Sequence, residues 1–106
     1  MPSLSQSSGT HRVFAVLRSR GPAFDDSKPL EEQQLWAEHA AFMDALFDER
    51  FAVLVGPLEG TRDALLILRA SSMTEVADRL ALDPWTSSGH LFTKQISQWQ
   101  LRLGSV

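Results

Sequence analysis

The sequence has no cysteine. Without thiols the chain cannot form disulfides, thiolate zinc sites or a thiol nucleophile. This absence leaves the cellular compartment undetermined, because a cytosolic protein can simply lack cysteine. It makes histidine and carboxylate side chains the principal candidates for acid/base chemistry.

Long apolar runs and clusters of basic residues are also missing. No run approaches the roughly 18 apolar residues of a membrane span, and the first residues, MPSLSQSSGTHR, lack the charged and apolar segments of a secretory signal. Lys and Arg number 10 against 13 Asp and Glu, which gives a formal net charge of -3. We therefore expect a soluble cytoplasmic protein with neither a membrane nor a nucleic acid as partner.

The sequence has no motif for a nucleotide or a metal ion. Gly56 and Gly60 do not stand in the glycine-rich patterns that cradle phosphates, and the three histidines lack the spacing of metal ligands. We expect no cofactor and no metal. The length of 106 residues indicates one domain, too small for a dinucleotide-binding fold or a large barrel. In so short a chain, a large ligand cavity competes with the core.

The order of elements follows from the spacing of apolar residues. Residues 1–11 contain four serines around a single leucine and predict a mobile tail. A strand is expected at 11–18 and a loop at 19–29. A helical period then runs over 30–50, with Asp26 or Ser27 as its cap.

Two apolar strands, 51–56 and 63–69, are separated by a turn. Ser72 and Glu75 form a capping-box pattern at the start of a second helix, which should stop before the Asp83-Pro84 step. Partial alternation over 91–103 predicts a last strand. The resulting βαββαβ order is that of a ferredoxin-like α+β domain with an antiparallel sheet, over residues 12–104.

The strands at 51–56 and 63–69 are apolar almost throughout, which predicts burial on both faces of the sheet. One layer of helices covers only one face. We therefore expect a second sheet against the other face and a functional unit that is at least a dimer.

His39 is the most informative polar residue, because it falls in the middle of the apolar face of the first helix. It is either a hydrogen-bonded structural histidine or a group presented to an internal pocket. Asp83 could orient it, since both helices of such a fold pack on the same sheet face. Alone, an Asp-Pro step is usually just a helix stop. Together the two residues would form a general acid/base pair.

Other polar candidates are weaker. Arg18 ends a strand and could bind an anionic ligand, although such a residue is more often solvated. Asp25 could add a carboxylate to the site, but loop aspartates normally serve turns and caps. His11 and His90 stand at strand starts and are expected to be exposed. The tryptophans are core, pocket or dimer-contact residues: Trp36, Trp85 and Trp99.

Several short strings occur together in a specific order. They are Arg18, Gly21-Pro22, Phe24-Asp25, Glu38-His39-Ala40, Phe42-Met43, Gly56-Pro57-Leu58, the run from Ala81 to Trp85, and Trp99 with Leu101-Arg102. In these features the chain, over about residues 12–104, resembles the YCII-related (YciI-like) family. It departs from some members in having Phe24 where another aromatic, often Trp, occurs.

The resemblance implies a ferredoxin-like fold that forms a homodimer through its sheets, giving the dimeric α/β barrel of muconolactone isomerases. It also implies a His-Asp dyad in a pocket, which here corresponds to His39 and Asp83. Some relatives resemble dehydrochlorinases. The expected function is thus cofactor-independent proton transfer or elimination on a small cyclic or aromatic molecule. Arg18, Asp25, the Gly56-Pro57 turn and Trp85 would help to bind that substrate. The alternative is a non-catalytic module that binds a small molecule.

Overall fold

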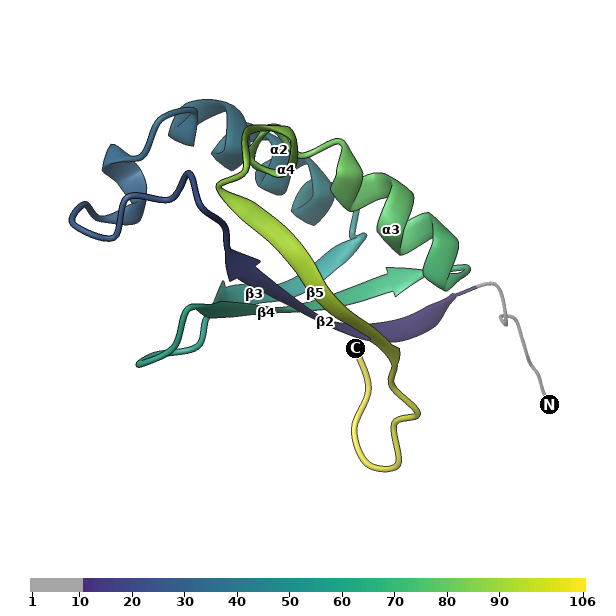
Figure 1. Ribbon diagram of the computed structural model, residues 1–106. Coiled ribbons are helices and arrows are strands. Elements are labelled where there is room, and N and C mark those ends of the chain that lie inside the picture. Colours follow the sequence, from purple (N-terminus) through teal and green to yellow (C-terminus); the bar gives the residue numbers. More distant parts are fainter. Residues whose placement is uncertain (1–10) are drawn as a thin grey trace, which may run out of the picture.

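A four-stranded antiparallel sheet forms the base of the molecule (Figure 1). The computed structural model describes residues 11–106, so the tail predicted at 1–11 lies, His11 apart, outside the described residues. The strand order is β3-β4-β2-β5, which makes the first and third strands the central ones. The strands are β2 (Arg12–Arg20), β3 (Ala52–Pro57), β4 (Asp63–Ala70) and β5 (Leu91–Gln98).

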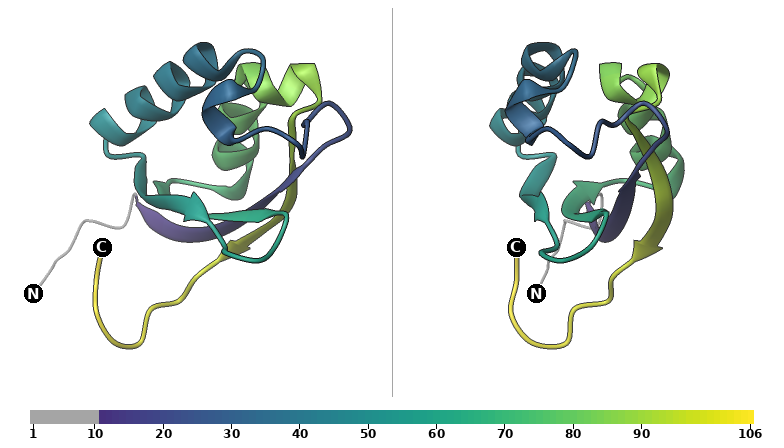
Figure 2. Two further views of the ribbon diagram at one scale, coloured as in Figure 1. Left: turned by 90° about the vertical axis from the view of Figure 1, so that its left-hand side faces the viewer. Right: turned by 60° about the vertical axis from the view of Figure 1, so that its left-hand side comes forward.

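The helices lie together on one face of this sheet (Figures 1 and 2). They are α2 (Trp36–Asp48), α3 (Met73–Ala81) and the short α4 (Pro84–Ser88), with a 3-10 turn η1 (Leu30–Glu32) before them. This α+β architecture is consistent with the ferredoxin-like arrangement predicted from the sequence. Among residues 11–106, no helix combines the length and the apolar character that crossing a bilayer requires.

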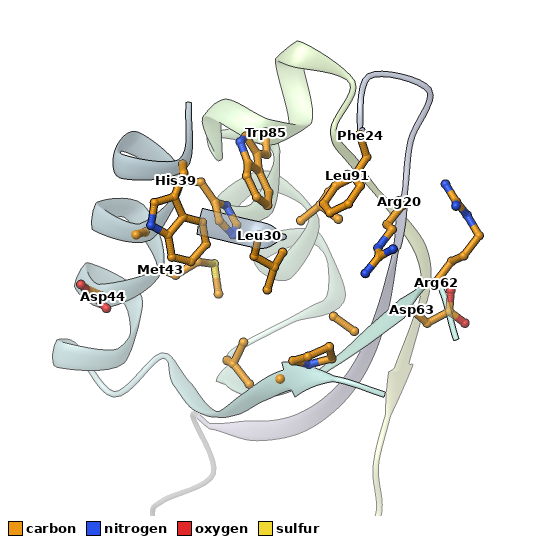
Figure 3. Close-up of a pocket in the computed structure, with 16 residues that line it drawn as sticks. Arg20, Phe24, Leu30, His39, Met43, Asp44, Arg62, Asp63, Trp85 and Leu91 are labelled. Carbon is orange, nitrogen blue, oxygen red and sulfur yellow. The ribbon is translucent and has the colours of Figure 1, made fainter. Parts of the chain in front are cut away.

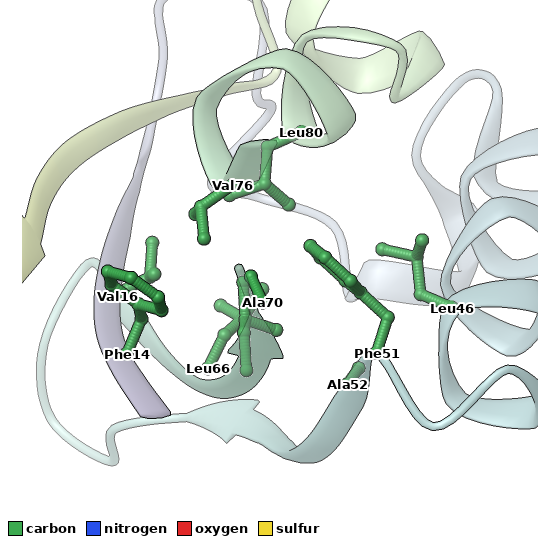
Figure 4. Packing of buried hydrophobic residues seen from close by; sticks show 10 residues of the cluster. Phe14, Val16, Leu46, Phe51, Ala52, Leu66, Ala70, Val76 and Leu80 are labelled. Carbon is green, nitrogen blue, oxygen red and sulfur yellow. The ribbon is translucent and has the colours of Figure 1, made fainter. Parts of the chain in front are cut away.

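Strand alternation decides which side chains meet the helices. In the central pair, Phe14 lies opposite Leu68 and Val16 opposite Leu66, and all four are buried under the helices. The same alternation places Arg18, two residues further along β2, on the helix side of the sheet. The hydrophobic core forms between these strands and the helices (Figure 4): Phe14, Val16, Leu46, Phe51, Ala52, Leu66, Leu68, Ala70, Val76 and Leu80.

The first helix is shorter than predicted. Instead of one helix over 30–50, a 3-10 turn is followed by α2, which begins at Trp36 after Leu35 in a left-handed conformation with φ of 64°. The expected caps are wrong, because no side chain caps this helix. The reason is Gln33, which is buried and bonds to the backbone of Asp25 and Lys28, so that it holds the preceding loop in place.

The second helix begins as predicted, with the Ser72 hydroxyl accepting a hydrogen bond from the Glu75 N–H at 3.1 Å. The Glu75 carboxylate bonds to Ser71 rather than returning to the cap residue. The chain then forms α4, a helix that the sequence reasoning missed. It runs from Pro84 to Ser88 and is capped by Gly89, whose φ of 85° suits a residue without a side chain.

The last strand is also shorter than predicted, since β5 ends at Gln98 rather than near Leu103. Its pairing with β2 shifts register between Leu17 and Arg18, where β5 carries one extra residue. This irregularity explains why the alternation in the sequence is only partial.

The face of the sheet turned away from the helices carries apolar side chains. Leu54 is 60% exposed and Trp99 48% exposed, whereas Ile67, on the same face, is buried. Ile67 and Trp99 belong to a shallow hollow on this face: Ala15, Leu65, Ile67, Ser97, Gln98 and Trp99. The sequence predicted that both faces of the sheet are buried. Within a single chain this holds only in part, because Leu54 on the outer face is mostly exposed.

Candidate active site

Asp83 lies at the junction between α3 and α4, and its side chain is fully buried. One carboxylate oxygen, Oδ1, accepts a hydrogen bond from the Trp85 N–H at 2.9 Å and so caps α4. The next residue, Pro84, suits the first helical turn because it has no N–H to satisfy there. The sequence thus fixes this carboxylate at the start of α4, close to the first turn of α2.

Arg18 holds the same carboxylate from the sheet side. Its Nη1 donates to Asp83 Oδ2 at 2.7 Å, and its Nη2 donates to the Thr86 hydroxyl. The side chain is 1% exposed, and its Nε has no hydrogen-bond partner among the described residues. Arg18 does not line the cavity, so the expectation that it binds a substrate there is wrong. It serves instead as the buried counter-ion of Asp83.

His39 approaches the carboxylate from α2. Its Nδ1 lies 2.9 Å from both Oδ1 and Oδ2 of Asp83. An ionised carboxylate only accepts hydrogen bonds, so this contact places the proton on Nδ1 and, in the neutral ring, leaves a lone pair on Nε2. Nε2 makes no hydrogen bond to a described residue, and the ring lines a cavity described below. The structure thus brings His39 and Asp83 together.

Charges around Asp83 keep it ionised. Burial raises the pKa of this carboxyl, but the hydrogen bonds from His39 and the Trp85 N–H, together with nearby positive charge from Arg18, hold the pKa below its usual range. For Arg18, burial lowers the guanidinium pKa and the negative charge of Asp83 opposes that effect. Arg18 and Asp83 therefore form a buried ion pair, and the His39 imidazole is hydrogen-bonded to its carboxylate.

Trp85 fixes the plane of the His39 ring. The two rings are stacked with centroids 4.0 Å apart and 6° between their planes. His90 stacks on Trp85 as well, at 5.3 Å, while the indole Nε1 donates to the Gln34 carbonyl at 2.8 Å. His90 is only 4% exposed, so the prediction of an exposed residue is wrong. The stack explains this burial, because His90 packs beneath the indole.

A cavity of about 470 Å³ opens beside His39, between α2 and the sheet (Figure 3). This volume lies within the roughly 300–1,000 Å³ typical of small-molecule sites. Its walls are mostly apolar, and its lining includes Trp36, Trp85, Phe24, Met43, Val55 and Leu91. Asp83 itself is hidden behind His39, so only the imidazole of the pair reaches the cavity.

Other predicted binding residues divide into two groups. Gly56, Pro57 and Trp85 line the cavity, whereas Asp25 does not. Asp25 accepts hydrogen bonds from the N–H and hydroxyl of Ser27, which is the turn role open to it from the sequence. The pKa of Asp25 is lowered by these same hydrogen bonds.

Sequence reasoning missed two arginines that line the cavity, Arg20 and Arg62. The position of Arg20 could have been predicted, because it follows Arg18 by two residues in a strand and so points to the same side of the sheet. Arg62 lies in the turn between β3 and β4, where no periodicity indicates direction. Within the described part of the chain, no group of three or more His, Cys, Asp or Glu side chains is placed to hold a metal ion.

Comparison with known proteins adds no name to this site. No protein-family model matches the chain, and a search of curated proteins finds no significant match.

Proposed function

We propose that this protein is an enzyme that transfers a proton to or from a small cyclic or aromatic molecule, with His39 as the general acid/base. The observation that carries the proposal is the position of the imidazole. Nδ1 is held by a buried, ionised carboxylate, the ring lines a largely apolar cavity of suitable size, and Nε2 makes no hydrogen bond to a described residue. The resemblance to YciI-like proteins supports the same roles for His39 and Asp83.

In this proposal Nε2 removes a proton from a carbon or oxygen atom of the substrate within about 3 Å. The ring then carries a positive charge, which the Asp83 carboxylate stabilises at 2.9 Å. For an isomerisation the imidazolium returns the proton at another atom. For an elimination, the electron pair of the broken C–H bond forms a double bond as a leaving group such as chloride departs. After an elimination, chloride leaves as the anion and the imidazolium releases its proton to water, which restores the neutral base.

The rigidity of the pair supports this chemistry. Asp83 is bonded to Arg18, His39 and the Trp85 N–H at once, so it cannot rotate without breaking several contacts. The indole stacked on His39 restricts the imidazole further. A general base held in one orientation loses little entropy when the substrate reacts.

A non-catalytic role in small-molecule binding is the second candidate. Complete burial of Asp83 and its use as a helix cap favour it, because a structural role would account for these features of the carboxylate. The pocket would then bind a metabolite without changing it. What distinguishes the enzymatic proposal is a ring that lines the cavity with no hydrogen-bond partner for Nε2 among residues 11–106, since a purely structural histidine does not need this.

The test replaces His39 by asparagine, whose amide can still donate toward Asp83 but offers no base at the Nε2 position. Lactones and haloaromatic compounds would be screened with the unmodified protein, and the variant assayed on any substrate found. We expect turnover to fall about 100-fold or more, the usual contribution of a general base. His90→Asn is the matched control, because it removes the other imidazole stacked on Trp85 without altering the cavity lining. Unchanged turnover in His39→Asn, or equal losses in both variants, would refute the catalytic role.

We propose further that a second copy of the chain covers the open sheet face, as in a dimeric α/β barrel. The support is the apolar hollow around Ile67 and Trp99, flanked by the exposed Leu54. A self-complementary apolar sheet face suits a two-fold dimer, in which two sheets pack about 10 Å apart. Sedimentation should give a dimer that Leu54→Glu dissociates. Leu82→Glu, on an even more exposed leucine at the end of α3, should leave it intact. A monomeric unmodified protein would exclude this assembly.

A further inference from the structure

One end of the cavity is basic. Arg20 at the end of β2 and Arg62 in the turn before β4 both line it, and the Arg20 N–H donates to the Arg62 carbonyl at 3.1 Å. The Arg20 guanidinium also lies over the Phe24 ring, 4.4 Å from its centroid. In Figure 3 the two arginines lie across the cavity from His39. The backbone bond therefore holds the two residues side by side, and the Phe24 ring positions the Arg20 guanidinium.

A carboxylate already bridges these two guanidinium groups. Asp26 accepts from Arg62 Nη1 at 2.6 Å through one oxygen and from Arg20 Nη1 at 3.3 Å through the other. The hydrogen bond from Arg62 lowers the pKa of Asp26 and outweighs desolvation, which acts in the opposite direction. The other guanidinium nitrogens of both arginines have no hydrogen-bond partner among residues 11–106. The two guanidinium groups share the single negative charge of Asp26, so this end of the cavity keeps a net charge of about +1.

The remaining charged groups around the cavity do not cancel this excess. Asp63 also lines it, but its carboxylate pairs with Lys94 at 3.1 Å. Asp44 belongs to α2, at the opposite end of the cavity from the arginines (Figure 3). Between the two ends the walls are apolar, with Trp36 and Trp85 among them. The cavity thus combines an aromatic interior with one cationic end.

We propose that the cavity binds a small aromatic or cyclic carboxylic acid, with its carboxylate at Arg20 and Arg62 and its ring against the tryptophans. Guanidinium groups match the planar carboxylate, and Asp26 demonstrates that geometry within the chain. This placement turns the carbon skeleton toward His39 Nε2. The inference deepens the proposed function by naming the substrate class, but it concerns binding alone and does not require turnover.

The test compares phenylacetate with phenylacetamide, which has the same shape and no charge. Dissociation constants would be measured by NMR chemical-shift titration, both in the unmodified protein and in His39→Asn. We expect phenylacetate to bind about tenfold more tightly, in line with a charge-assisted hydrogen bond at a partly exposed site. Because His39→Asn lacks the proposed base, binding that persists in it separates this inference from the proposed catalysis.

Three variants at the basic end locate the effect: two change a charge, and Arg20→Lys keeps the charge but lacks the forked guanidinium. Arg62→Gln and Arg20→Lys should weaken phenylacetate binding and leave phenylacetamide unchanged. Asp26→Asn should strengthen phenylacetate binding, because it frees both guanidinium groups. Arg102→Gln is the control for net charge: it is exposed and does not line the cavity.

Equal affinity for phenylacetate and phenylacetamide would overturn the proposal. So would a loss in Arg102→Gln as large as that in Arg62→Gln, since the effect would then be one of overall charge. Phenyl phosphate binding much more tightly than phenylacetate would refute the choice of a carboxylate in favour of a phosphate ester. Circular dichroism of each variant confirms that it is folded.

Discussion

Asp83→Asn should be one of the most damaging single substitutions in the protein. Asparagine keeps an oxygen that can accept from the Trp85 N–H, so the cap of α4 survives. What is lost is the negative charge that Arg18 needs, and that guanidinium is 1% exposed. Removing one partner of a buried ion pair typically costs about 3–5 kcal/mol, because the other charge is left buried without compensation.

The lower end of that range gives a large thermal effect. For a domain of about 100 residues, 1 kcal/mol corresponds to roughly 4–8 °C in Tm. A loss of about 3 kcal/mol therefore lowers Tm by roughly 12–24 °C. Calorimetry or urea denaturation followed by circular dichroism would measure it. A fall of less than about 1 kcal/mol in the free energy of unfolding would refute the reasoning, because an exposed ion pair contributes that much without any burial.

A second substitution checks the cause. If the cost comes from the unpaired charge of Arg18, then removing that charge should return part of the stability. The double variant Arg18→Met with Asp83→Asn should be more stable than Asp83→Asn alone, because methionine fills a similar space without a charge. A double variant less stable than the single one would assign the loss to packing instead.

The pH dependence of stability has a definite sign. The pKa of Asp83 is lower in the folded protein than in the unfolded chain. Its stabilising contribution is therefore complete above the unfolded value of about 3.9 and is lost as the pH falls from there through the folded pKa. The stability gap between the unmodified protein and Asp83→Asn should narrow over this acidic range.

Three further substitutions test the fold. Gly21→Ala should cost about 1–3 kcal/mol in urea denaturation, because its Cβ would collide with the Gly89 carbonyl oxygen and disturb the bond from the Gly21 N–H to the His90 carbonyl. Leu68→Ala should cost about 2–5 kcal/mol in the same assay, since Leu68 is fully buried. Ser72→Ala should cost about 1 kcal/mol by removing the cap of α3, and an unchanged midpoint would contradict that role.

Local signals predicted most of the fold. The capping pattern at Ser72 and the apolar runs that became β3 and β4 depend on neighbours in the sequence, and the structure has these elements within a few residues of the predicted ends. The start of α2 could not be predicted in this way. It depends on Gln33, whose side chain bonds to backbone groups of a distant part of the loop.

In the candidate site, too, the residues with a local signal could be predicted, and those placed by distant contacts could not. His39 was identifiable because a titratable residue on an apolar helix face requires a partner, and Asp83 was identifiable at a helix end. Arg18 was misjudged, because only the shifted register of β5 and the fold of α4 place Asp83 and Thr86 over that strand position. Arg62 could not be assigned, since the turn alone orients it.

The several bonds of Asp83 have an evolutionary consequence. Catalytic residues often reduce stability, so their retention is taken as a sign of selection for activity. Here the carboxylate caps a helix and neutralises a buried guanidinium, so selection for folding alone would retain it. Among related sequences, an invariant Asp83 would therefore carry little information about activity. The informative position is His39, because glutamine or asparagine there could also donate a hydrogen bond to Asp83, whereas neither offers a base at the Nε2 position.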